Sequence, residues 1–262
     1  MILDVRNLSF GYHKDRILFR NVNFSVEKGE VFSILGSNGI GKSTLLNCIA
    51  NLLTPFEGEI SLNGVPMKNM DLKEIAKTIG YVPQMHDVAY AYEVRDYIVM
   101  GRAPYLGMFG KPSEEDYRLA DKTMDELGIS HLAGRAYTEL SGGERQQVSI
   151  ARAIVQQPDI IILDEPTNHL DYGNQLRMIH MIRKLAQSGY GVIITSHMPD
   201  HVLLLDGNVG ILGDDGQLRV GTTREIMTKE NLEELYHVEI FMIHVDEVGR
   251  DVCVAGKAED MK

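Results

Sequence analysis

The chain has 262 residues, of which 44% are hydrophobic and 24% are charged, and its formal net charge is −11. This composition is typical of a globular protein with a substantial core, and the acidic balance argues against nucleic acid as a partner. The best apolar run, Ile160–Leu163, is far shorter than the roughly 18 residues that a membrane span needs, and no secretory leader is expected at Met1. Any membrane role is therefore expected to come through a partner chain.

Two segments near the start of the chain are predicted to be strands, Ile2–Phe10 and Glu59–Leu62. We expect them to form an antiparallel sheet beside the core. The two cysteines, Cys48 and Cys253, match no metal or redox spacing, so we expect small buried or half-buried thiols in a reducing cytoplasm.

Three short apolar runs are typical of strands covered on both faces, and they alternate with helical patterns. They are Val31–Leu35, Ile160–Leu163 and Val192–Thr195. This alternation predicts an α/β fold with a largely parallel sheet. After the first run, a glycine-rich turn leads into a predicted helix whose apolar side carries Leu45, Leu46, Ile49, Ala50 and Leu53, with Pro55 ending the helical region.

The stretch from about residue 85 to 157 has helical patterns at Tyr117–Leu127 and Glu144–Val155 and little strand character. We interpret it as an α-helical subdomain inserted into the sheet domain. The sheet domain and this inserted subdomain are predicted to form one large domain over residues 1–236.

A short extension, residues 237–262, is predicted to follow this domain. It contains two strand-like pieces, Val238–Val245 and Asp251–Ala255, and the final residues Gly256–Lys262 are expected to be frayed. Its role is not readable from the sequence.

A phosphate-binding loop is predicted between the first apolar strand and the helix, because the segment fits G-x-x-x-x-G-K-[ST]. Its residues are Gly36, Ser37, Asn38, Gly39, Ile40, Gly41, Lys42 and Ser43. The glycines let successive backbone N–H groups face one anion, and the helix that follows adds its positive end. Lys42 can reach the β- and γ-phosphates, and the Ser43 hydroxyl can bind Mg²⁺. The segment predicts ATP binding on a P-loop NTPase core.

Two carboxylates follow the second buried strand. Asp164, at the strand tip, can hold Mg²⁺ directly or through water, and Glu165 can act as general base on the attacking water. A plain polar turn is the alternative, but the phosphate loop favours the catalytic interpretation.

Ser141, Gly142 and Gly143 open the predicted helix near Glu144. A helix start with exposed amides can bind an anion. A simple capping turn with Ser141 as the N-cap explains the same residues.

The order of these motifs resembles the ATP-binding cassette (ABC) ATPases from about Ile2 to Met227. Gly36–Ser43 is similar to their Walker A motif, Leu140–Glu144 to their signature, and Asp164–Glu165 to the end of their Walker B motif. The resemblance implies a RecA-like α/β P-loop core with an antiparallel β subdomain and an inserted α-helical subdomain.

The resemblance extends to isolated residues. It implies that Tyr12 stacks on adenine, that Gln84 is the Q-loop glutamine near Mg²⁺ and the attacking water, and that His197 is the switch histidine that touches the γ-phosphate. Asn168–Asp171 falls at the D-loop, and the resemblance counts Thr44 and Asp171 among the nucleotide-binding residues.

The mechanism implied by the resemblance needs two copies of the chain, facing each other head to tail with ATP between them. Ser141, Gly142 and Gly143 of one copy would contact the γ-phosphate held by the other, and ATP would close the dimer. The implied cofactors are ATP and Mg²⁺.

The sequence departs modestly from the family pattern. Ser37 and Ile40 replace a proline and an alanine in Walker A, and Asn168-His169 replaces Ser-Ala in the D-loop, a variant found in importers of metal chelates. The common acidic residue directly after His197 is absent, because Met198 stands there.

The segment Ala89–Arg102 is unusually aromatic and apolar for an expected surface. In transporters of this family the groove there receives a helix of the permease. The alternative is that these side chains fill the core of the helical subdomain.

The run from Met100–Tyr105 to Pro112–Asp116 resembles importers of iron–siderophore, haem and cobalamin complexes, and of molybdate or tungstate. This implies an importer ATPase at the cytoplasmic face of a membrane, working with two permease subunits and, indirectly, an extracytoplasmic binding protein. A soluble regulatory ATPase that acts on protein or nucleic-acid partners, or an exporter ATPase, is the alternative. The cargo is not encoded in this subunit.

Overall fold

The computed structural model of the protein describes residues 1–13, 16–84, 90–107 and 109–256. Its centre is a six-stranded sheet in the order β10-β9-β3-β8-β7-β6, parallel between all neighbours apart from the antiparallel pair β9 and β10. The strands are β3 (Val31–Leu35), β6 (Ile79–Val82), β7 (Ile160–Leu163), β8 (Gly191–Ser196), β9 (Asn208–Leu212) and β10 (Leu218–Thr222). Every residue of β3, β7 and β8 is buried, which confirms the prediction of strands covered on both faces.

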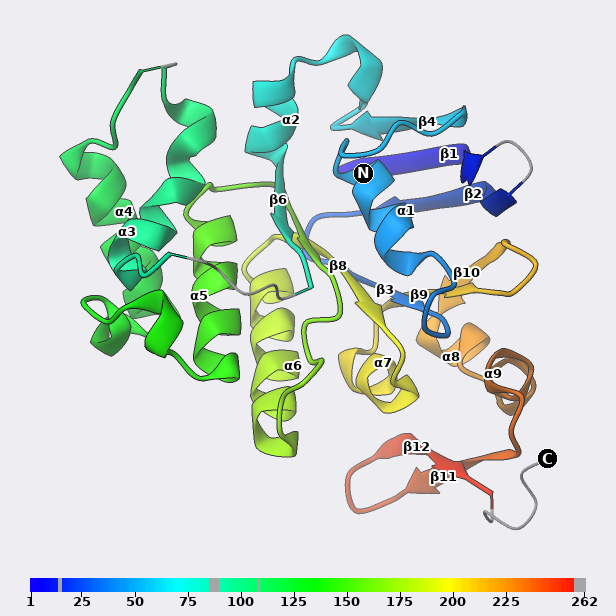
Figure 1. The fold of residues 1–262 in the computed structure, drawn as a ribbon. Helices are drawn as coiled ribbons and strands as arrows, with labels where there is room; N and C mark the ends of the chain where they lie inside the picture. The colour runs from blue at the N-terminus through cyan, green and yellow to red at the C-terminus, as the bar shows by residue number, and fades with distance from the viewer. Residues whose placement is uncertain (14–15, 85–89, 108, 257–262) are drawn as a thin grey trace.

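A four-stranded antiparallel sheet lies beside the central one, in the order β2-β1-β4-β5 (Figure 1). Its strands are β1 (Leu3–His13), β2 (Arg16–Val26), β4 (Glu57–Leu62) and β5 (Val65–Pro66). The predicted antiparallel sheet is confirmed. The sequence analysis did not identify β2, which pairs along most of β1.

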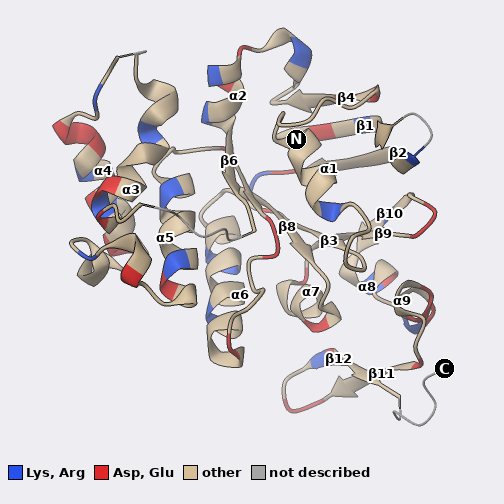
Figure 2. Cartoon of the chain, viewed as in Figure 1, with Lys and Arg blue, Asp and Glu red and all other residues tan. Residues whose placement is uncertain are grey.

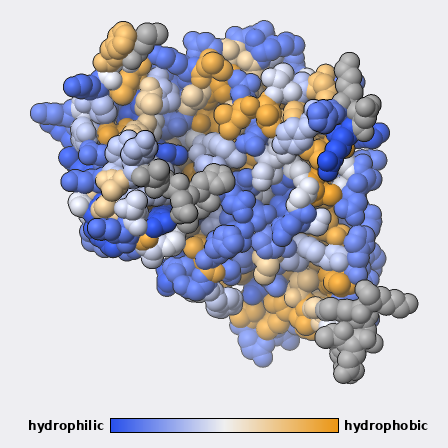
Figure 3. All heavy atoms as spheres, in the orientation of Figure 1, coloured by the Kyte–Doolittle hydropathy of each residue, from blue (hydrophilic) through white to orange (hydrophobic). Residues whose placement is uncertain are grey.

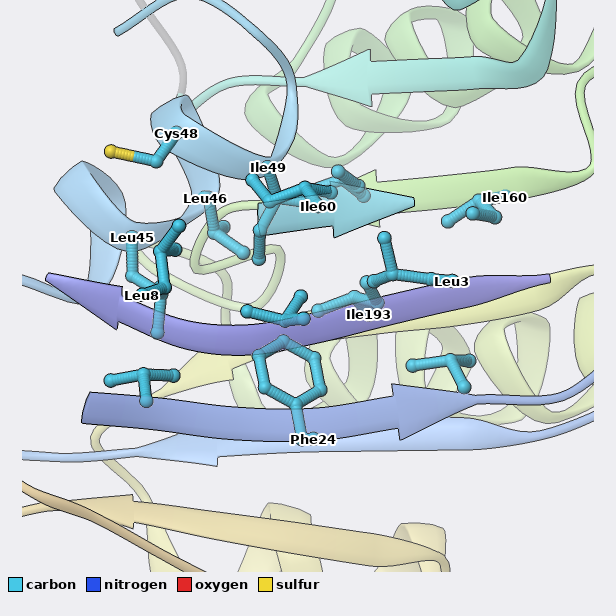
Figure 4. Packing of buried hydrophobic residues seen from close by; sticks show 14 of the residues in the cluster. Leu3, Leu8, Phe24, Leu45, Leu46, Cys48, Ile49, Ile60, Ile160 and Ile193 are labelled. Carbon is cyan, nitrogen blue, oxygen red and sulfur yellow. The ribbon is translucent and has the colours of Figure 1, made fainter. Parts of the chain in front are cut away.

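Helix α1 (Lys42–Ile49) packs into the core shared by the two sheets. Figure 4 shows Leu45, Leu46 and Ile49 pointing toward the strand that carries Leu3 and Leu8, and all five are buried in one cluster. The strong apolar stripe on the helix therefore positions its N-terminus at the end of β3.

The predicted end of this helix near Pro55 is wrong. Helix α1 stops at Ile49, because Asn51 adopts a left-handed conformation with φ of 59° that cannot continue a helix. Ala50 and Leu53 lie beyond the helix but still pack partly buried against the same core.

A helical layer covers one end of the central sheet (Figure 1). It is formed by α3 (Val94–Val99), α4 (Glu114–Glu126) and α5 (Gly142–Ile154), which share a separate hydrophobic cluster. Helix α2 (Leu72–Thr78) connects the antiparallel sheet to β6. The predicted helical character of this stretch agrees with the structure, whereas the bounds of the subdomain stay a prediction. Residues 85–89 and 108 of the stretch lie outside the described residues.

The aromatic segment after Gln84 is divided between core and surface. Its buried side chains, which fill the core of the helical layer, are Val94, Tyr97, Ile98 and Val99. Tyr90, Tyr92 and Met100 are exposed, and Ala89 lies outside the described residues. The core-filling alternative therefore holds for the middle of the segment, and the flanking residues keep surface available for a partner.

The last third of the chain supplies further helices and a terminal hairpin. The elements are α6 (Tyr172–Gln187), α7 (Pro199–Leu205), α8 (Thr223–Ile226), α9 (Lys229–Tyr236), β11 (Ile240–Val245) and β12 (Arg250–Ala255). The two predicted terminal strands pair as the antiparallel hairpin β11–β12. Of the tail expected to be frayed, residues 257–262 lie outside the described part.

Both cysteines are free, as expected. Cys48 is buried and burial raises the pKa of its thiol to about 12, while Cys253 is half-buried. Figure 2 shows basic and acidic residues mixed over the helices rather than separated onto different faces. Among the described residues, no helix is both long and apolar enough to cross a membrane.

Candidate functional site

The loop between β3 and α1 has the backbone conformation that an anion cradle needs. Gly39 and Gly41 have φ of 80° and 115°, in the region where a residue with a side chain is strained. Gly41 directly precedes α1, so the loop runs into the positive end of the helix. The loop can therefore present several N–H groups to a phosphate.

Lys42 holds a buried ammonium at the centre of this loop, with only 4% of the residue exposed. Its Nζ donates hydrogen bonds to the carbonyl oxygens of Gly36 at 2.9 Å and Ser37 at 3.0 Å. It also lies 3.2 Å from Oε1 of Glu165, at the end of β7. The ammonium therefore connects the two sequence motifs directly.

Glu165 has a strained backbone, with φ of 45°. This left-handed conformation typically costs about 1–3 kcal/mol and is concentrated at functional sites. The Glu165 N–H donates to Oγ1 of Thr195 at 2.8 Å, and that hydroxyl donates to Oδ1 of Asp164 at 2.6 Å. One threonine on β8 therefore fixes both carboxylate residues, and Asp164 is 3% exposed.

Two further side chains contact the Glu165 carboxylate. Nδ1 of His197, just after β8, lies 3.1 Å from Oε2, and Nδ2 of Asn168 donates to the same oxygen at 3.2 Å. With Lys42, three polar groups from three separate segments meet this carboxylate. A carboxylate fixed in this way can accept a proton from a water at a defined position.

The site opens into a cavity of about 520 Å³. Its lining residues are Tyr12, Arg16, Leu18, Asn38, Gly39, Gly41, Lys42, Ser43, Thr44, Gln84, Glu165 and Asn168. The structure therefore places nine of the predicted site residues, from four distant parts of the chain, around one space. Tyr12 is 60% exposed at its rim, and its hydroxyl lies 3.3 Å from Oγ1 of Thr44.

Ser141, Gly142 and Gly143 are not among the residues that line this cavity in the described chain. Ser141 is the N-cap of α5: its Oγ accepts from the Glu144 N–H, and the Glu144 carboxylate accepts from the Ser141 N–H. This N–H bond is the main reason why the pKa of Glu144 is lowered. The capping interpretation of Ser141 is confirmed, and anion binding there stays a prediction.

Asp171 is a helix cap as well. Its Oδ1 accepts from the Asn174 N–H at 2.8 Å at the start of α6, and this bond is the main cause of a lowered pKa for Asp171. The Asn174 side chain lies against Gly143, where an added Cβ would meet it at 3.1 Å. The Ser-Gly-Gly turn and the D-loop segment are therefore neighbours in one copy of the chain.

Sequence reasoning missed several residues of this site. Arg16 and Leu18 reach the cavity from β2, and no local pattern identifies them because they depend on the pairing of β1 with β2. Thr195 could have been predicted as a site residue, since it is a polar residue at the carboxyl end of an apolar strand. His201 is also buried, and its Nδ1 lies 3.0 Å from Oγ1 of Thr167 beside the D-loop.

Known proteins share this sequence and fold. The sequence model of the family described as ABC transporter matches residues 19–168. The molybdate import ATP-binding protein MolC of Haemophilus influenzae is 39% identical, over 91% of this chain and 89% of its own. The hemin import ATP-binding protein HmuV of Bordetella avium is 34% identical, over 95% and 97%. A solved metal-chelate type ABC transporter, in an inward-facing conformation, has a chain that is 35% identical and superposes with a TM-score of 0.88 over 98% of both chains.

Proposed function

The chain belongs to the ABC transporter family as an ATP-hydrolysing subunit, and we propose that it powers the import of a metal chelate or metal oxyanion across a membrane. The observation that supports ATP hydrolysis most is the convergence of Lys42, His197 and Asn168 on the Glu165 carboxylate, beside a cavity lined by the phosphate loop.

Within this site we assign nucleotide contacts by chemistry. The backbone of Gly36–Ser43 and the Lys42 ammonium bind the phosphates, and Thr44 continues the same helix start. Tyr12, exposed at the cavity rim, offers its ring for stacking on adenine, which is worth about 1–3 kcal/mol for a base on an aromatic side chain. Glu165 would accept the proton of the attacking water, and His197, which contacts Glu165, would contact the γ-phosphate.

Ser43, Gln84 and Asp164 are the residues that would hold Mg²⁺. They offer a hydroxyl, an amide and one carboxylate, the oxygen ligands that Mg²⁺ prefers, and phosphate oxygens and water would complete the shell. Ser43 and Gln84 both line the cavity beside Glu165. The ion would neutralise phosphate charge when bound.

A second copy of the chain completes the site in this proposal. The Ser141–Gly143 turn lies outside the cavity of its own chain, whereas its helix start is suited to an anion. In the head-to-tail arrangement this turn contacts the γ-phosphate bound to the other copy, with Asp171 at the same interface.

The partners of the dimer follow from its relatives. Molybdate and hemin import proteins and a metal-chelate type transporter resemble this chain over nearly its full length. We therefore place it at the cytoplasmic face of a membrane, under two permease subunits that receive cargo from an extracytoplasmic binding protein. The exposed Tyr90, Tyr92 and Met100 offer an apolar surface for the permease.

An ATPase assay in proteoliposomes tests this function. The chain is co-purified with its permease, and binding proteins loaded with molybdate, haem or an iron chelate are added one at a time. We expect one loaded binding protein to stimulate hydrolysis, with no stimulation of a Glu165→Gln complex. Failure to co-purify with any permease, together with hydrolysis that no binding protein changes, would favour a soluble regulatory ATPase.

A further inference from the structure

The residue just before the C-terminal extension touches the switch segment through a hydrogen bond. Tyr236, the last residue of α9, donates its hydroxyl proton to the carbonyl oxygen of His197 at 2.8 Å. Burial, followed by the nearby Cys253, raises the pKa of this tyrosine, so the hydroxyl remains a donor at any physiological pH. The contact joins residues 39 positions apart in sequence.

A second tether runs from the hairpin to the helix that follows His197. The backbone N–H of Cys253, on β12, donates to Oδ1 of Asp200 in the first turn of α7 at 3.0 Å. Apolar packing surrounds both tethers, because α7 shares one hydrophobic cluster with α9 and the hairpin. Its members include Val202, Leu203, Leu232, Leu235, Ile240 and Met242.

The hairpin therefore has an inner face against α7 and a more exposed outer face. Phe241 and Val254, opposite each other on the two strands, are exposed, and Figure 3 shows hydrophobic residues gathered over this end of the molecule. The inner face, with Ile240 and Met242, holds the hairpin in place. Residues 237–256 thus form a folded support that packs against α7, the helix that follows the switch segment.

The position of the His197 backbone matters because its ring is aligned with Glu165. The ring Nδ1 lies 3.1 Å from the carboxylate, and displacement of the backbone by an ångström would break this contact. The turn is otherwise fixed locally by the bond from the Met198 N–H to the Ser196 hydroxyl at 3.0 Å. Tyr236 supplies the bond to the His197 peptide from outside this turn.

We propose that Tyr236 is a positioning residue for hydrolysis, which fixes the His197 peptide through its hydroxyl and so couples the C-terminal hairpin to the catalytic site. The proposal rests on the proposed roles of His197 and Glu165. It assigns a purpose to residues 237–256: they hold α9 and α7 together so that the tyrosine reaches the switch segment.

The test compares two tyrosine-to-phenylalanine variants of the full chain. In Tyr236→Phe the bond to His197 is lost. In Tyr105→Phe a bond of the same kind is lost far from the site, because the Tyr105 hydroxyl donates to the Gln156 carbonyl at 2.9 Å. We expect Tyr236→Phe to lower kcat about threefold to tenfold with the KM for ATP changed less than about twofold, and Tyr105→Phe to change neither.

A kcat for Tyr236→Phe equal to that of Tyr105→Phe would overturn the proposal. An Asp200→Asn variant, which weakens the second tether and leaves the tyrosine intact, should lower kcat in the same direction. Melting temperatures of all three variants, with kcat measured well below each of them, separate this effect from general destabilisation. A Glu165→Gln variant that hydrolyses ATP at the wild-type rate would instead reject the proposed function itself.

Discussion

The Lys42 ammonium lies 3.2 Å from a carboxylate oxygen of Glu165, and both side chains are almost fully shielded from water. The same ammonium donates to the carbonyl oxygens of Gly36 and Ser37. The phosphate loop and the end of β7 are thus joined through one charge pair. A triphosphate that binds the loop must compete for this lysine, so nucleotide binding and the release of the Glu165 carboxylate are linked.

Replacement of Lys42 should therefore weaken the binding of ATP itself, and not only its hydrolysis. In Lys42→Met we expect ATP affinity to fall at least about tenfold, because charge-assisted bonds to phosphate are lost. Fluorescence titration with a labelled ATP measures this. The matched control is Lys122→Met on an exposed face of α4, which should leave affinity unchanged. Wild-type affinity in Lys42→Met would contradict the assignment of the phosphate loop.

Thr195 should be important for stability as well as for the site. Its buried hydroxyl satisfies Asp164 and the Glu165 N–H, so Thr195→Val leaves two buried polar groups without this partner. We expect the free energy of unfolding to fall by about 1–3 kcal/mol, measured by urea denaturation. Thr195→Ser keeps the hydroxyl and should lose much less. Equal stabilities for the two variants would show that the threonine hydroxyl is not needed.

The lowered pKa of His201 leads us to predict that the stability of the fold depends on pH. Burial, with a smaller effect of the His197 charge, lowers its pKa below the ordinary value of 6.5. The unfolded chain then takes up a proton below pH 6.5 that the folded chain resists, so stability is lost as pH falls through this range. Between about pH 7.5 and about pH 5.5 this contributes up to about 1.4 kcal/mol.

The variant His201→Gln isolates this contribution. Its unfolding free energy, measured by urea denaturation at both pH values, should decline less than that of the wild type. Parallel declines in the two proteins would mean that His201 titrates equally in the folded and unfolded chains.

The sequence predicted those parts of the fold that short-range patterns determine. The largely apolar run at Val31–Leu35 and the fully apolar run at Ile160–Leu163 identified buried parallel strands with correct bounds, and the glycine spacing located the phosphate loop. Capping by Ser141 followed from its position before Gly142. In each case the signal lies within a few neighbouring residues.

Features that depend on distant contacts were not predictable in this way. The second half of β2 does alternate, with Val22, Phe24 and Val26 buried, but Arg16 reaches the cavity only because β2 pairs with β1. The end of α1 depends on one left-handed residue, Asn51, which the apolar pattern does not reveal. The contact of Tyr236 with His197 requires the whole C-terminal segment to fold back onto α7.

The most direct measurement of the central claim is the association state of the Glu165→Gln variant with ATP. We predict that hydrolysis falls by at least about 10²-fold while ATP binding persists, so that light scattering shows a stable dimer with ATP and a smaller species without it. A Ser141→Arg change in the same background should prevent this dimer, because it places a bulky side chain at the proposed contact with the γ-phosphate of the partner. Undiminished hydrolysis by Glu165→Gln, or an ATP-dependent dimer that forms equally well with Ser141→Arg, would contradict the account.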